Sequence, residues 1–99
     1  MKLRLHVGAA RDIEQAADYF GSVSLRLRAG LGVELDKALE RIATYPHTGT
    51  PLAGSSKIRR MTIKRFPYSI IYTTIEPEIV VLAFAHHSRR PDYWSDRAK

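Results

Sequence analysis

Residues 59–94 read RRMTIKRFPYSIIYTTIEPEIVVLAFAHHSRRPDYW, and this stretch decides the fold. Tyr68 to Ile75 is rich in β-branched and aromatic residues, which favours a strand. Ile79 to Ala85 is continuously apolar, as expected of a central strand that is buried on both faces. Ile58 to Arg65 alternates between two faces, which predicts a further strand. The segment therefore predicts three consecutive strands, with turns at 66–67 and 76–78.

A strand and a helix are predicted upstream of this segment. Leu3 to Val7 alternates apolar and polar residues, the pattern of a half-buried strand, and Gly8 is expected to end it. Apolar residues then recur at helical spacing, which predicts a helix over Ala9 to Phe20. Asp12 suits the positive end of that helix, and Gly21 is placed to stop it.

A second helix follows at once. Ser24 can cap its start, and Tyr45-Pro46 ends it, because a residue before proline resists the helical conformation. Its charged residues, Glu34 among them, are expected to face outward. The helices must lie antiparallel because only a few residues join them. Residues 47–57 are expected to be a turn-rich connector, and residues 88–99 a polar tail.

The element order β-α-α-β-β-β predicts one α+β domain over residues 1–99. We expect an antiparallel sheet packed against the N-terminal helical hairpin. The first strand must join that sheet, since a lone strand would leave its backbone groups unpaired.

Composition excludes several classes of protein. The chain has no cysteine, so disulfides and thiolate chemistry are excluded. The run from Ile79 to Ala85 is too short to span a bilayer, and the N-terminus lacks an apolar signal region. We therefore expect a cytoplasmic protein that does not engage membranes.

Positive charge is concentrated in the second half of the chain. The formal net charge is +6; residues 1–50 hold seven Lys/Arg against six Asp/Glu, and residues 51–99 hold nine against four. Such an asymmetry suits binding to nucleic acid or to an acidic protein. A solvated basic surface that only aids solubility explains the charge about equally well.

The histidines do not predict a metal site. His86 and His87 are adjacent, so on an extended chain their side chains point to opposite faces. A structural role for His86 is favoured over a general acid or base. Ser69 has no paired His and Asp in a recognisable order, and no glycine-rich phosphate loop is present. No cofactor is expected.

Basic residues cluster near the predicted strands. Arg60 and Lys64 share one strand face with Thr62 between them, while Arg89 and Arg90 follow the central strand. If they converge at one end of the sheet, they can bind phosphates or the acidic residues of a partner helix.

These residues together resemble a known family. Arg60, the segment Phe66-Pro67-Tyr68-x-Ile70-x-Tyr72 and the pattern His86-x-x-Arg89-x-Pro91-x-Tyr93-Trp94-x-x-Arg97 are similar to the RelE/ParE toxin superfamily of toxin–antitoxin modules, whose members are often called plasmid stabilisation proteins. The resemblance spans nearly the whole chain, including the helical hairpin.

The resemblance implies a small toxin that a cognate antitoxin neutralises through a flexible segment. Such antitoxins usually carry the DNA-binding domain, so operator DNA would be contacted only indirectly. Two activities divide the superfamily: RelE-like members cleave messenger RNA on the ribosome, and ParE-like members poison DNA gyrase and are not nucleases.

The resemblance to the nuclease branch is incomplete. Arg60 and Arg89 match expected cations, but Thr62 and Ser69 stand where that branch carries a lysine and an arginine. Losing two such cations should remove several kcal/mol of transition-state stabilisation. The ParE-like branch is therefore favoured. The alternatives are a RelE-like endoribonuclease and an inactive relative that acts only in a repressor complex.

Two sets of site residues follow from the resemblance. The catalytic set, which applies only if the protein is a nuclease, comprises Arg60, Lys64, His86 and Arg89. The set expected to bind the target, gyrase or the ribosome with its message, comprises Arg59, Arg60, Arg65, Arg89, Arg90, Tyr93 and Trp94.

Overall fold

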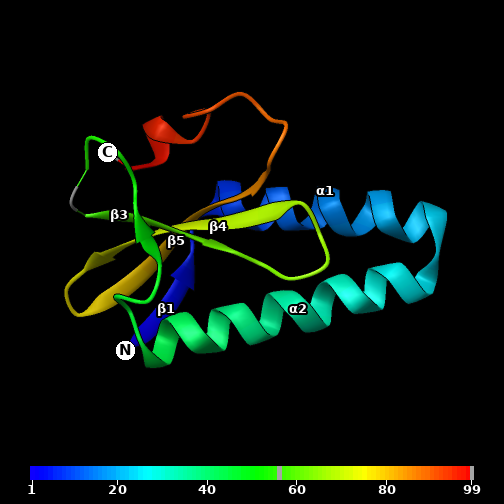
Figure 1. The fold of residues 1–99 in the computed structure, drawn as a ribbon, viewed down its shortest axis with the longest axis horizontal. Coiled ribbons are helices and arrows are strands. Elements are labelled where there is room, and N and C mark those ends of the chain that lie inside the picture. Colours follow the sequence, from blue (N-terminus) through cyan, green and yellow to red (C-terminus); the bar gives the residue numbers. More distant parts are fainter. Residues whose placement is uncertain (56, 99) are drawn as a thin grey trace.

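The computed structural model describes residues 1–55 and 57–98. A five-stranded sheet carries a helical hairpin on one face and the C-terminal tail on the other (Figure 1). The hairpin consists of α1 (Val7–Val23) and α2 (Leu25–Thr44), and the tail ends in a short 3₁₀ helix, η1 (Ser95–Ala98). The predicted α+β fold class, with an N-terminal helical hairpin, is confirmed.

The sheet has the strand order β1-β5-β4-β3-β2. Its strands are β1 (Lys2–Leu5), β2 (Thr50–Pro51), β3 (Ile58–Thr62), β4 (Tyr68–Ile75) and β5 (Glu78–His86). The pairs β5–β4, β4–β3 and β3–β2 are antiparallel as expected, but β1 runs parallel to β5, so the sheet is mixed. The prediction that the first strand joins the sheet is confirmed, but the expected antiparallel arrangement is wrong for this strand.

The helix boundaries differ from the prediction at two glycines. Gly8 does not precede the helix but lies inside its first turn, because α1 begins at Val7. The Nδ1 atom of His6 accepts a hydrogen bond from the Gly8 N–H at 2.9 Å, and His6 thereby caps α1. Gly21 lies inside α1, which ends at Val23. The cap at Ser24 is confirmed: its Oγ accepts from the N–H groups of Arg26 and Leu27 at 3.1 and 3.3 Å.

The strands follow the prediction closely in the centre of the sheet and less well at its edge. The predicted bounds of β4 are confirmed. In contrast, β3 ends at Thr62, and Arg65 takes a positive φ of 71° in the turn that follows. The two-residue strand β2, which pairs with Arg59 and Arg60, lies inside the segment predicted to be a connector.

Apolar side chains form a core on each face of the sheet. The larger core lies under the hairpin and includes Leu31, Ile42, Ile70, Tyr72 and Phe84. The smaller core lies under the tail and comprises Ile71, Val80, Leu82, Ala83 and Trp94. Both faces of β4 and β5 are therefore buried, which explains the continuous apolar run at residues 79–85.

Glu34 departs from the predicted pattern of α2. It was expected to face outward, but it is buried, with 9% of its surface exposed. Its Oε2 lies 3.9 Å from Nη1 of Arg65, so the turn after β3 supplies a cation to a carboxylate at the edge of the core.

Candidate functional site

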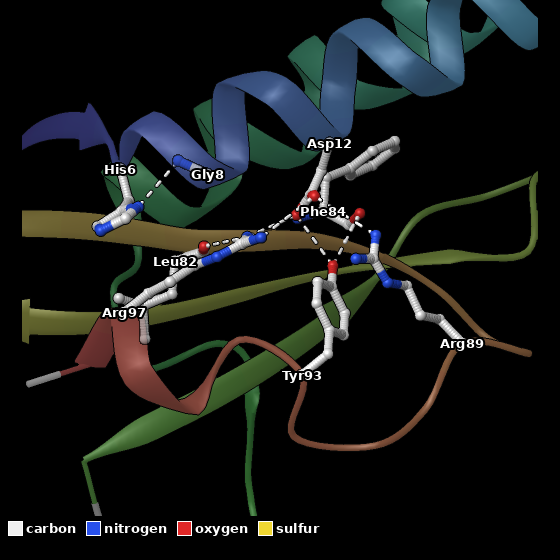
Figure 2. Close-up of polar contacts among 8 residues, drawn as sticks. All are labelled: His6, Gly8, Asp12, Leu82, Phe84, Arg89, Tyr93 and Arg97. Carbon is white, nitrogen blue, oxygen red and sulfur yellow. Dashed lines mark hydrogen bonds and ion pairs between the residues drawn. The ribbon is translucent and has the colours of Figure 1, made fainter.

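Asp12 on α1 holds the C-terminal tail against the sheet (Figure 2). Its Oδ2 accepts hydrogen bonds from Nη1 of Arg97 at 2.7 Å, from the Tyr93 hydroxyl at 2.9 Å and from the Phe84 backbone N–H at 3.1 Å. The Asp12 side chain is only 4% exposed, so its charge requires these partners. We call Asp12, Arg89, Tyr93 and Arg97 the tail clamp.

Arg89 and Arg97 complete the tail clamp in different ways. Arg97 also donates to the Leu82 backbone carbonyl at 3.1 Å, which ties η1 to the middle of β5. The Arg89 guanidinium lies 3.7 Å from the Tyr93 ring centroid and 3.6 Å from Oδ1 of Asp12, and its side chain is 45% exposed. Arg89 is therefore the clamp cation that solvent, or a ligand, can reach.

The environment of Tyr93 keeps its hydroxyl protonated. Burial raises the pKa of Tyr93 to about 12, and the hydrogen bond and negative charge of Asp12 act in the same direction, while Arg89 and Arg97 oppose them. A protonated hydroxyl is what the bond to Asp12 requires, because the carboxylate can only accept.

Most of the C-terminal motif quoted above thus has a structural explanation. Trp94 was expected to bind a target, but it is 7% exposed and packs in the smaller core. Tyr93 and Arg97 belong to the tail clamp. The tail is therefore packed against the sheet rather than being the polar extension expected from its composition.

Asp12 is the residue that the sequence analysis missed. It was assigned to the helix dipole, yet it lies three residues after Ala9 and four before Ala16, both buried. That spacing places Asp12 on the buried face of α1. An acidic residue on an apolar stripe was the available signal.

Besides Arg89, two of the predicted target-binding cations contact the protein itself. Nη1 of Arg59 donates to the backbone carbonyls of Gly49 and His47 at 2.8 and 3.2 Å. Arg65 pairs with Glu34, and its guanidinium lies 5.5 Å from the Phe66 ring centroid. Arg60 and Arg90 are exposed, and among the described residues neither side chain has a hydrogen-bond or ion-pair partner.

The structure does not bring the four candidate catalytic residues together. Arg60, His86 and Arg89 all border one hollow on the tail side of the sheet, although the ring of His86 packs 5.0 Å from that of Tyr68, towards the hairpin side. Lys64 lines a separate groove beside α2. Arg89 reaches the tail side but is partly neutralised by Asp12.

A trough of about 420 Å³ lies on the tail side of the sheet, between β3, β4, the end of β5 and the tail. On its floor the Thr62 and Ser69 hydroxyl oxygens are 3.1 Å apart, and Ser69 Oγ is 3.0 Å from Nε2 of His87. No histidine lies near Ser69 in the sequence; the strand pairing supplies one, 18 residues away. We call this the tail-side trough.

A second hollow, of about 440 Å³, runs between α2 and the end of β3. Three cations lie along it, Lys37, Arg41 and Lys64, with Glu34 at its wall. Since Glu34 already pairs with Arg65, the balance of charge in this α2 groove is positive.

Neither hollow offers a metal site: within residues 1–55 and 57–98 no cluster of three or more His, Asp or Glu side chains could hold an ion. Over the same residues, no helix has both the length and the hydropathy needed to cross a membrane.

Comparison with known proteins decides the family. The sequence model of the ParE toxin of the type II toxin–antitoxin system parDE matches residues 3–91. The chain belongs to the ParE toxin family. The matched region of this ParE-family chain includes Asp12 and Arg89 but stops before Tyr93, Trp94 and Arg97.

A solved structure supports the fold. A chain described as the chromosomal ParDE TA system from P. aeruginosa matches with a TM-score of 0.72 and 18% sequence identity, over 87% of this chain and 95% of that chain. At that identity the likeness is one of fold. A comparison with curated proteins finds no significant match.

Proposed function

We propose that this ParE-family chain is the toxin of a type II toxin–antitoxin module, that it inhibits DNA gyrase by binding it, and that a cognate antitoxin neutralises it. The observation that carries the gyrase assignment is that Lys64 lies in a separate groove from Arg60 and Arg89, and that Asp12 partly neutralises Arg89. A nuclease needs its cations gathered at one phosphate. Membership of the ParE family supports the same choice.

The target-binding surface, on this proposal, consists of the exposed cations of the predicted set: Arg60, Arg65, Arg89 and Arg90. Of these, Arg60 and Arg90 have no side-chain partner among the described residues, so they give up no internal contact when they bind. Arg59, Tyr93 and Trp94 contribute by fixing the backbone that presents them.

The antitoxin, on this proposal, inserts an acidic amphipathic segment into the α2 groove. Lys37, Arg41 and Lys64 supply the complementary charge, and Met61 and Ala38 supply apolar contacts. Charge complementarity of this kind selects the partner and speeds association.

Supercoiling by purified gyrase tests the target. We expect the toxin to inhibit the reaction and Arg90→Ala to weaken inhibition by about tenfold, the usual effect of one charged contact. Arg26→Ala removes an equal charge from the hairpin and is expected to leave inhibition unchanged. Normal supercoiling at saturating toxin contradicts the gyrase assignment.

Expression of the chain in cells separates the alternative functions. Cleavage of translated messages within codons, abolished by Arg89→Ala, would identify a ribosome-dependent nuclease instead. Failure of the expressed chain to arrest growth would identify an inactive relative that acts only in a repressor complex.

Binding to the antitoxin is tested separately. The partner is expected to be encoded by a short adjacent reading frame with a DNA-binding domain and an acidic tail. Lys37→Glu reverses one charge in the α2 groove and should weaken the complex by at least tenfold while gyrase inhibition is retained. An unchanged dissociation constant would place the antitoxin elsewhere.

A further inference from the structure

Three features converge on the tail-side trough. It has the volume of a small-molecule site, about 420 Å³. Apolar side chains form part of its wall, among them Leu52, Ile71 and Pro91. Cationic side chains, Arg60 and Arg89, stand on two different segments that border it.

Strand pairing explains why the polar groups of the trough lie together. Thr62 on β3 pairs with Ser69 on β4, and Ser69 pairs with Ala85 on β5. Arg60 lies two residues before Thr62 and His87 two residues after Ala85, so these side chains share the tail-side face. The cation, the two hydroxyls and the imidazole therefore come from three neighbouring strands or their ends.

Thr62, Ser69 and His87 form a chain of hydrogen bonds, and the direction in which its two hydroxyls donate depends on the His87 imidazole. Each hydroxyl has one proton to donate. When Nε2 of His87 carries a proton, it donates to Ser69, Ser69 donates to Thr62, and the Thr62 hydroxyl proton is left to point into the trough. Ser69 is only 3% exposed, so both of its hydrogen-bonding directions are used inside the chain and Thr62 presents the donor.

A group that meets this surface must accept hydrogen bonds and carry negative charge. Arg60 has no partner among the described side chains, and a guanidinium binds phosphate oxygens in a bidentate manner. The apolar wall next to it suits a base or sugar rather than a bare ion. We propose that the tail-side trough binds the phosphate group of a nucleotide, with Arg60 and the Thr62 hydroxyl as direct contacts and His87 as the group that sets the direction of the hydroxyl chain.

This binding depends on which ring nitrogen of His87 carries a proton. The other charged or titratable groups that line the trough are Arg60, Arg89, His86 and Asp92. A phosphate that accepts from Thr62 favours the form of His87 with a proton on Nε2, and the neutral imidazole already has a tautomer of that kind. The proposal does not rest on gyrase inhibition, although Arg60 and Arg89 also belong to the target-binding surface proposed above.

The test is titration of the isotope-labelled chain with adenosine 5′-monophosphate, followed by amide and imidazole NMR shifts. We expect saturable shifts at Thr62, Ser69 and His87. Adenosine, which lacks the phosphate, should give none, and inorganic phosphate should shift the same signals with weaker affinity. Equal affinities for phosphate and the nucleotide would overturn the nucleotide assignment in favour of a free phosphoanion.

Variants sharpen the test. Arg60→Gln should weaken nucleotide binding by about tenfold, whereas Arg26→Gln, with the same loss of charge at the start of α2, should not. His87→Phe keeps a planar ring but cannot donate to Ser69, so it should weaken nucleotide binding as well. No saturable shift up to about 10 mM nucleotide, or equal losses in the two arginine variants, would overturn the proposal.

Discussion

Oδ2 of Asp12 lies 2.7 Å from Nη1 of Arg97, so a carboxylate on the first helix fixes a side chain 85 residues further along the chain. Through this pair the tail closes over the face of the sheet that the helices leave uncovered (Figure 2). The tail-side trough and the exposed guanidinium of Arg89 both depend on that closure, because part of the trough wall belongs to the tail.

Asp12→Asn should loosen the tail clamp. The substitution keeps the shape but leaves the guanidinium of Arg97, 18% exposed, without its counter-ion, and breaking a buried pair in this way costs about 3 kcal/mol. We expect that loss in the free energy of unfolding, measured in urea. Hydrogen exchange at the amides of residues 89–97 should accelerate beyond what the global loss explains.

A matched control separates the clamp from charge alone. Asp18→Asn removes the same charge from α1, but Asp18 is 69% exposed and lies 3.8 Å from Arg28, which is also exposed. An exposed pair of this kind contributes at most about 1 kcal/mol. If Asp12→Asn costs no more than Asp18→Asn, the tail is held mainly by apolar packing of Trp94.

Gly8→Ala should destabilise the protein because position 8 contacts the C-terminal tail. A Cβ at this position would overlap the guanidinium of Arg97, whereas alanine in a helix otherwise improves on glycine by about 1 kcal/mol. We expect Gly8→Ala to lower the free energy of unfolding in the natural chain and to raise it in an Arg97→Ala background. Additive effects in this double-mutant cycle would mean that Arg97 moves aside without cost.

The pH dependence of stability should report on Tyr93. Its folded pKa, about 12, lies above the ordinary tyrosine value near 10, so its stabilising contribution is complete below pH 10 and is lost as the pH rises towards 12. Tyr93→Phe should be less stable at pH 8, and the gap to the natural chain should shrink between pH 10 and 12. Urea unfolding at several pH values measures it.

The difference in free energy of unfolding between the natural chain and Tyr93→Phe does not depend on the other tyrosines. Burial raises the pKa of Tyr68 and Tyr72 as well, and both remain in the variant, so their effects cancel in the difference. A gap that stays constant from pH 8 to 12 would show that folding does not raise the pKa of Tyr93.

Periodicity was enough to predict the centre of the fold. The β-branched and aromatic run at residues 68–75 and the continuous apolar run at residues 79–85 became β4 and β5 nearly as predicted, because burial of both faces leaves little freedom of register. Ser24 also caps the start of α2, as predicted. These features depend on neighbours in the sequence or on burial of a continuous apolar run.

The candidate site was harder to predict because it depends on pairs distant in sequence. Nothing near Ser69 indicates His87, and nothing near Asp12 indicates Arg97; strand register and tail closure bring them together. The predicted start of the first helix, after Gly8, is wrong because the His6 side chain caps the helix two residues earlier and accepts from the Gly8 N–H. Trp94 was assigned to a partner because its core, on the tail side of the sheet, exists only once the tail folds back.

Tyr72→Phe should destabilise the connection between α2 and the sheet. The Tyr72 hydroxyl donates to the Pro46 carbonyl at 2.9 Å and accepts from the Gly49 N–H at 2.8 Å, and Tyr72 is fully buried. Phenylalanine fills the same space but leaves a buried N–H unpaired, which costs about 1–3 kcal/mol. Arg59 donates to the Gly49 carbonyl, so a loosened connector also frees that cation. Arg59→Ala should therefore lower the free energy of unfolding by less in the Tyr72→Phe background than in the natural chain.

Urea unfolding of the two single variants and the double variant measures this coupling. A loss below about 0.5 kcal/mol for Tyr72→Phe alone would mean that water replaces the hydroxyl and that Arg59 holds the connector instead.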